Sequence, residues 1–210
     1  MADALFKKIR LATTKLGEMR KFYGETLGFP VIVDGENQFA IQVGSSVLEF
    51  HISATVGQPL YHYAMNIPEN QIEDALAWAQ ERIEIVVNPS TGHPIFEFAH
   101  WNAHAFYFLD PEGNIGEVIA RHTMGNASSK RFEVEQVECV SELGVATSNV
   151  PLAAQLLADK FGLLPYPDPN ASSNEEFQAV GSESGMFIVA KKGRMWLSSD
   201  QKAGAFPASV

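Results

Sequence analysis

The sequence predicts an α+β fold built from consecutive copies of one unit, in which a strand and a helix are followed by three more strands. The order strand, helix, strands occurs twice before residue 122. A third copy then begins: residues 11–16 (LATTKL) align with 145–150 (VATSNV), and 27–29 (LGF) with 161–163 (FGL), both at an offset of 134 residues (145 minus 11, 161 minus 27). A hydrophobic content of 46% is typical of a chain with a packed core.

The first unit begins with a strand at residues 6–14. A helix follows, because apolar residues recur every three or four positions and Gly28 stands where a left-handed cap would end the helix. The residues of this apolar stripe are Leu16, Met19, Phe22, Tyr23 and Leu27. Two tight turns then separate three strands, which we expect at 29–34, 38–43 and 47–53.

The second unit repeats this order, with a strand at 61–67 and a helix from Pro68 to Arg82. After a strand-like stretch at 83–87, the segments 96–98, 103–109 and 115–121 are expected to be extended. The turn Asp110-Pro-Glu-Gly-Asn114 is a strong signal, since Pro sets φ while Gly and Asn accept positive φ. The polar segment 123–131 is predicted to be a linker, and the third unit to contribute strands at 176–181, 186–191 and 194–197.

The charge of the chain excludes several classes of partner. With 15 basic and 25 acidic residues the net charge is −10, which disfavours nucleic acid and anionic membranes as partners.

The single cysteine, Cys139, can form neither an internal disulfide nor a thiolate zinc cluster, which suits a reducing compartment. The first residues do not have the pattern of a secretion signal. We therefore expect a soluble cytoplasmic protein that binds a small molecule.

Two motifs connect the chain to a known family. Residues 22–29 (FYGETLGF) after a first strand, and residues 108–117 (FLDPEGNIGE) at the end of the second unit, resemble the vicinal oxygen chelate superfamily. This superfamily includes glyoxalase I, extradiol dioxygenases, and fosfomycin and bleomycin resistance proteins. The resemblance implies that two units form an open, cupped, glyoxalase-like sheet around a divalent metal.

The resemblance also predicts a domain organisation. Residues 1–122 would form one paired module that contains the cup, residues 123–131 the linker, and residues 132–210 an extra half-module. This third unit would be structural or would form a dimer. A half-module leaves a sheet edge and an apolar face uncovered, and the same half of a second chain would cover both. We therefore expect a homodimer.

Metal ligands of the family stand on the first and last strands of each unit, which here are Lys8, Glu49, His62 and Glu117. Glu49, His62 and Glu117 suit Mn, Fe, Ni or Zn. Lys8 departs from the pattern, because a charged ammonium has no lone pair. His51 lies two residues after Glu49 on the same face and could replace the missing ligand, or be a strand-end histidine near solvent. Alternatively, Lys8 neutralises the carboxylates and the cup holds no metal.

Other candidates would contact the substrate. Arg10 shares the face of Lys8, so the pair could bind an anionic oxygen or could be solvated strand-edge charges. Trp101 could line an apolar pocket in which Asn102 or His104 orients the substrate, although these loop residues could equally lie at the surface.

The third unit offers an incomplete set of ligands. Glu142 occupies the place of Lys8, but the place of Glu49 falls on Ile188 or Val189. One potential ligand without a partner predicts no metal site in this unit.

Two functions remain open from the sequence. The first is a divalent-metal-dependent enzyme of the lyase, isomerase or dioxygenase type, acting on a small oxygen-chelating molecule, with Glu117 or Glu49 as the base. The dioxygenase version would need a histidine where Lys8 stands. The alternative is a metal-free small-molecule binding protein of the bleomycin-resistance type.

Overall fold

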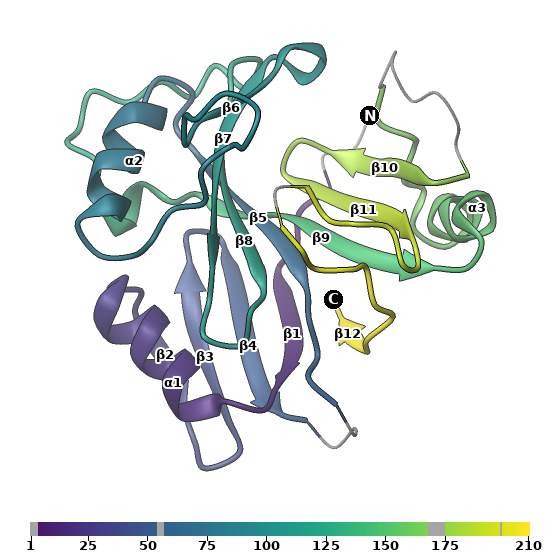
Figure 1. Cartoon of the computed structure of the whole chain (residues 1–210), viewed down its shortest axis with the longest axis horizontal. Coiled ribbons are helices and arrows are strands. Elements are labelled where there is room, and N and C mark those ends of the chain that lie inside the picture. Colours follow the sequence, from purple (N-terminus) through teal and green to yellow (C-terminus); the bar gives the residue numbers. More distant parts are fainter. Residues whose placement is uncertain (1–3, 54–56, 168–174, 198) are drawn as a thin grey trace.

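The computed structural model describes residues 4–53, 57–167, 175–197 and 199–210, which form two sheets (Figure 1). The first unit contains β1 (Lys8–Thr13), α1 (Leu16–Arg20), the π-helix η1 (Lys21–Thr26), β2 (Val31–Asp34), β3 (Gln38–Val43) and β4 (Ser46–Ile52). Its strands form a five-stranded sheet in the order β12-β1-β4-β3-β2, completed by β12 (Ala208–Ser209).

The second and third units share a sheet. The second contains β5 (His62–Ile67), α2 (Ile72–Gln80), β6 (Phe96–Phe98), the 3₁₀ helix η2 (Ala99–Trp101), β7 (Ala103–Leu109) and β8 (Ile115–Arg121). The third contains β9 (Cys139–Thr147), α3 (Val150–Phe161), β10 (Phe177–Ser182) and β11 (Gly185–Lys191), after the 3₁₀ helix η3 (Val134–Gln136). The seven strands are ordered β10-β11-β9-β5-β8-β7-β6.

The α+β class and the repeated βαβββ unit are confirmed, but the predicted pairing of the units is not the one in the structure. Residues 1–122 do not share one sheet, because β5 pairs with β9 of the segment 132–210. The edge that suggested a homodimer is thus covered by β5 of the same chain, and that argument for a dimer no longer applies. All six side chains of β5 are buried, as expected of a central strand with both faces covered.

Local sequence signals account for the ends of two helical segments. In α3 the side chain of Asn149 accepts a hydrogen bond from the Leu152 amide at 3.0 Å, and Gly162 ends the helix at a φ of 68°. Gly28 likewise follows the first helical segment at a φ of 78°.

The expected strands at 83–87 and 194–197 contain only single bridges, from Val86 to Tyr107 and from Met195 to Lys202. None of the described helices is long and apolar enough to cross a membrane.

The turn before β8 joins the first two units. The buried Asp110 accepts hydrogen bonds from the Glu112 and Asn114 amides at 3.0 and 2.9 Å, and from the Tyr23 and Tyr63 hydroxyls at 2.9 and 3.1 Å. Burial raises the pKa of Asp110 to about 6. These contacts hold the start of β8 in place, and with it the side chains that β8 presents.

The segment 123–131 contains no helix or strand but packs against the start of α2. Asn70 and Ser128 exchange two hydrogen bonds of 2.9 Å, and the Glu69 amide donates to Asn126 at 3.0 Å. These bonds hold the connection between the second and third units against the fold.

Candidate metal centre

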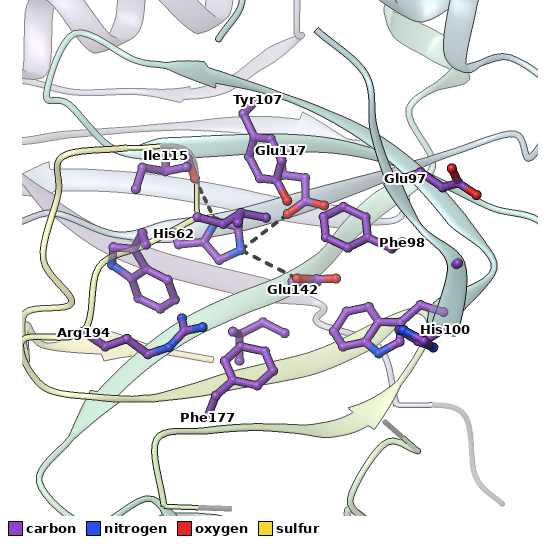
Figure 2. Close-up of a pocket in the computed structure, with 15 residues that line it drawn as sticks. His62, Glu97, Phe98, His100, Tyr107, Ile115, Glu117, Glu142, Phe177 and Arg194 are labelled. Atoms are coloured by element: carbon purple, nitrogen blue, oxygen red, sulfur yellow. Dashed lines mark hydrogen bonds and ion pairs between the residues drawn. The ribbon is translucent and has the colours of Figure 1, made fainter. Parts of the chain in front are cut away.

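Three buried side chains from neighbouring strands converge in the seven-stranded sheet (Figure 2). They are His62 of β5, Glu117 of β8 and Glu142 of β9, and their potential ligand atoms all lie within 4.8 Å of one another. The Nε2 atom of His62 is 3.6 Å from a carboxylate oxygen of each glutamate. The three residues are at most 6% exposed. Such a set is costly to bury unless its charges are compensated.

The strand register explains why these residues meet. Ala64 lies opposite Glu117 in the parallel β5–β8 pair and opposite Glu142 in the antiparallel β5–β9 pair. Residues that face each other across a ladder point to the same side of the sheet, and His62 shares that side because it is two residues before Ala64. The small side chain of Ala64 leaves room between the two carboxylates.

The hydrogen bond of His62 determines which ring nitrogen faces the carboxylates. The Nδ1 atom lies 3.2 Å from the carbonyl oxygen of Ile115, which can only accept, so Nδ1 carries the hydrogen. In the neutral ring the lone pair of Nε2 therefore points towards Glu117 and Glu142, and metal-binding histidines are commonly held in this way. Burial lowers the pKa of His62, but the two carboxylates outweigh it and raise that pKa above the ordinary value.

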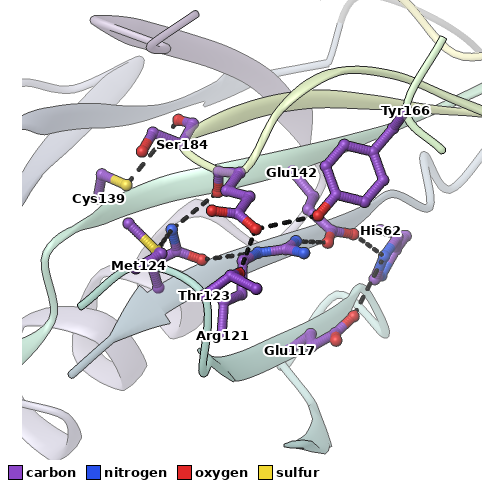
Figure 3. Close-up of polar contacts among 11 residues, drawn as sticks. His62, Glu117, Arg121, Thr123, Met124, Cys139, Glu142, Tyr166 and Ser184 are labelled. Atoms are coloured by element: carbon purple, nitrogen blue, oxygen red, sulfur yellow. Dashed lines mark hydrogen bonds and ion pairs between the residues drawn. The ribbon is translucent and has the colours of Figure 1, made fainter. Parts of the chain in front are cut away.

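Glu142 is held by an ion pair deeper in the sheet (Figure 3). Its second oxygen pairs with Arg121, whose side chain is fully buried and whose Nε donates to Asn66 at 3.3 Å. Burial by itself would raise the pKa of Glu142. The interaction with His62 and the guanidinium of Arg121 outweigh that effect and hold the pKa of Glu142 below its ordinary range. Glu142 therefore stays ionised.

Glu117 behaves in the opposite way. Burial, followed by the negative charge of Glu142, raises the pKa of Glu117 to about 8, although His62 and Arg121 act against this shift. The hydroxyl of Tyr107 is hydrogen-bonded to Glu117 from the adjacent strand. Without a cation, Glu117 is therefore protonated at neutral pH.

The three side chains lie at one side of a cavity of about 420 Å³. The walls are mainly apolar and aromatic, and they come from the β6–β7 region, from β10 and β11, and from the segment after β11. The remaining lining residues are Glu97, Phe98, Ala99, His100, Trp101, Tyr107, Ile115, Phe177, Ile188, Arg194, Trp196 and Leu197. This arrangement suits a small molecule with a polar end at the three ligands.

The predicted combination of Glu49 with His62 and Glu117 is wrong. Glu49 lies in the other sheet, where its carboxylate is 2.7 Å from the Nζ of Lys8 and 2.6 Å from the Nε of Arg10. None of these three residues lines the cavity. The predicted interaction of Lys8 with an inward carboxylate does occur, but on the five-stranded sheet, because the first unit does not pair with the second.

The other predicted residues lie in different places. His51 is on β4, away from the cluster, and burial lowers its pKa. Trp101 lines the cavity as predicted. Asn102 is exposed, with a φ of 46°, and His104 is instead hydrogen-bonded to His122 at 2.7 Å; neither lines the cavity.

Sequence reasoning missed Glu142, although its alignment with the place of Lys8 was a usable signal. The structure pairs this residue with ligands of the second unit. By register, Ile188 stands to Glu142 as Glu117 stands to His62, because Met186 lies opposite Glu142 and Ile115 opposite His62. Ile188 therefore occupies the fourth ligand position and leaves a three-ligand set.

Comparison with family models and with curated proteins finds no match to this sequence. Among solved structures, the chain is similar to a candidate dioxygenase from Bacillus subtilis, with a TM-score of 0.63 and 12% sequence identity. The similarity covers 90% of this chain and 64% of that protein, so the chain spans just under two thirds of its length. The chain has the fold of the vicinal oxygen chelate superfamily.

Smaller proteins with this fold match part of the chain. A lactoylglutathione lyase from Agrobacterium tumefaciens has a TM-score of 0.45 and 14% identity, over 56% of this chain and 92% of that chain. A glyoxalase/bleomycin resistance protein/dioxygenase from Nocardioides has a TM-score of 0.45 and 18% identity, over 62% of this chain and 91% of that chain. A fold of this kind does not determine a reaction, so the function has to be argued from the site.

Proposed function

We propose that the chain is a divalent-metal-dependent enzyme of the lyase or isomerase type, acting on a small molecule that presents two neighbouring oxygens. The convergence of His62, Glu117 and Glu142 is the observation that supports this proposal. One nitrogen and two carboxylate oxygens, all acceptors when unprotonated, meet within 4.8 Å. A cation such as Mn²⁺, Fe²⁺, Ni²⁺ or Zn²⁺ would compensate this set and retain open positions for substrate.

The donor set favours lyase or isomerase chemistry over dioxygenase chemistry. Iron oxygenases commonly bind their metal with two histidines and one carboxylate. Here the proportion is reversed, with His62 as the only imidazole beside two carboxylates. Hard oxygen ligands suit an ion that acts by polarising substrate oxygens.

The residues of the chain divide the remaining work. A cation bound by His62, Glu117 and Glu142 would supply Lewis acidity to the substrate oxygens. Arg121 orients Glu142, and Tyr107 orients Glu117 through its hydroxyl. We assign Glu117 as the general base, because Glu142 is held in its ion pair with Arg121; Glu117 would have to leave the cation while it takes the proton. The aromatic walls exclude water from the reacting atoms.

The test is the metal content of variants that separate the two sheets. The protein is purified without chelator, incubated with each ion, desalted and analysed by elemental mass spectrometry. Glu117→Gln and Glu142→Gln should lose the bound metal. Glu49→Gln is the matched control, since Glu49 is a buried carboxylate at the equivalent position of the first unit, and this variant should retain it. Loss of metal from the control alone would contradict the placement of the site.

A metal-free binding protein is the second candidate. It is favoured by the Arg121–Glu142 ion pair and by the raised pKa of Glu117, because together they allow the cluster to exist without a cation. In this case no ion is retained by the wild type under any condition. Small aromatic ligands would still bind in the cavity, and Glu117→Gln would leave their affinity nearly unchanged.

A further inference from the structure

The cavity contains a cation that the proposed metal chemistry does not use. Arg194 lies on the segment after β11 and lines the cavity opposite the strands that carry the three ligands. Figure 2 shows its guanidinium directed inwards, towards the space in front of His62 and Glu142. Its hydrogen bond to protein is a long one, 3.4 Å, to the carbonyl oxygen of the adjacent Met195. No acidic side chain in the described part of the chain lies within ion-pair distance.

The side chain is nevertheless held in place. The guanidinium carbon lies 5.0 Å from the centre of the Phe177 ring, a cation–π distance that keeps the planar head group against the wall. The backbone of the segment is tied to residues 201–203, since the Trp196 amide donates to Gln201 at 2.9 Å and the Ala203 amide to Arg194 at 2.8 Å. An oriented fork of donors whose hydrogen bond to protein is a long one to a backbone carbonyl can bind a carboxylate in two-pronged fashion.

Arg194 differs from the cations beside the other candidate residues, each of which is paired with a carboxylate. Arg121 is bound to Glu142, and Lys8 and Arg10 are bound to Glu49. The acidic side of the cavity is therefore compensated by Arg121 and, in the proposed function, by the metal. It does not require Arg194 as a counter-ion.

We propose that Arg194 binds the carboxylate of a flat, largely apolar substrate whose two neighbouring oxygens lie at the metal centre, so that the substrate class is an aromatic or similarly planar carboxylate. The contact between the two substrate oxygens and the metal rests on the proposed function. The flat shape follows from the aromatic walls, which include Phe98, Trp101, Phe177 and Trp196. A planar ring placed between such side chains buries apolar surface on both faces.

The test compares two probes that differ in the anionic group. In Zn²⁺-loaded protein, 3,4-dihydroxybenzoate and 4-methylcatechol offer the same pair of oxygens, but only the first has a carboxylate. Calorimetry should show that the wild type prefers the carboxylate by about tenfold or more. Arg194→Gln should abolish the preference, and Arg194→Lys should retain part of it. Lys192→Gln changes an exposed charge of the same segment and should behave as wild type.

Each result bears on the inference. Equal affinity for the two probes, a preference that survives in Arg194→Gln, or binding of neither probe overturns it. The same titrations in chelator separate this inference from the proposed function. If the protein binds no metal but its carboxylate preference persists in chelator and disappears in Arg194→Gln, the role of Arg194 stands while the metal-dependent function fails. If metal binds normally and no carboxylate preference is seen, the metal centre stands and the assigned substrate class is wrong.

Discussion

Replacing Glu117 by glutamine should stabilise the metal-free protein, increasingly so as the pH rises. Burial and the charge of Glu142 raise the pKa of Glu117 from 4.5 to about 8. Between these two values the folded state holds a proton on Glu117 that the unfolded chain has released, so the contribution of Glu117 to the stability of the wild type falls by about 1.4 kcal/mol per pH unit. Over the three units from pH 5 to pH 8 the loss amounts to about 4 kcal/mol. Glutamine resembles the protonated acid and carries no such dependence.

The assay is thermal unfolding of the wild type and Glu117→Gln at pH 5, 6.5 and 8 in the presence of chelator. The difference in stability should grow with pH, and at pH 8 it corresponds to a melting temperature on the order of 10 °C higher for the variant. Glu49→Gln serves as the control, because it removes a buried carboxylate and leaves Glu117 in place. The part of the pH dependence of stability that comes from Glu117 should therefore be the same in Glu49→Gln as in the wild type.

Two results would refute this reasoning. If the wild type and Glu117→Gln show the same pH dependence, Glu117 does not hold the additional proton. If the variant is less stable than the wild type at pH 8 in chelator, the carboxylate contributes favourably without a cation, contrary to its burial beside Glu142. Saturating divalent metal should reverse the order, because a cation that binds the folded wild type stabilises it by mass action.

Three further outcomes are expected. Ile188→His should place an imidazole at the fourth ligand position, where a contribution of only about 1.4 kcal/mol would tighten the metal Kd about tenfold. Competition with a chromophoric chelator measures this Kd. Unchanged affinity would contradict the assignment of Ile188 to the fourth ligand position. Glu142→Gln leaves the guanidinium of Arg121 buried without its carboxylate and should cost about 3–5 kcal/mol in chemical denaturation, much of which the added change Arg121→Met should restore. Gly116→Ala introduces a Cβ that would overlap the ring of the buried Phe108, so a loss of about 1–3 kcal/mol is expected in thermal unfolding. An unchanged stability would contradict the close packing of this ring on Gly116.

Much of the fold can be predicted from the sequence, because it depends on short-range physics. Apolar residues at helical spacing bury one side of each helix, and Gly28 and Gly162 end two helical segments through a left-handed conformation that glycine adopts without strain. The register of the repeats places His62 and Glu117 on the first and last strands of the second unit. Both do lie on one face of the seven-stranded sheet, since side chains alternate along a strand.

The identity of the third ligand beside His62 and Glu117 depended on tertiary structure. Glu49 stands on the last strand of the first unit and Glu142 on the first strand of the third, and each is a buried carboxylate at a candidate ligand position. The long-range pairing of β5 with β9 brings Glu142 to His62, whereas Glu49 is compensated in the other sheet by Lys8 and Arg10. Strand pairing depends on the burial of both faces across the whole molecule, which residue spacing within one unit does not report.

The sequence by itself therefore determined the repeated unit, the helices and strands within it, and two of the three residues in the candidate centre. Only the tertiary structure decided which units share a sheet, and with that the contribution of Glu142 and the position of Arg194 at the cavity. The physical reason is that local spacing controls which face a side chain occupies. The edge at which two strands join is controlled by packing between segments that are far apart in the chain.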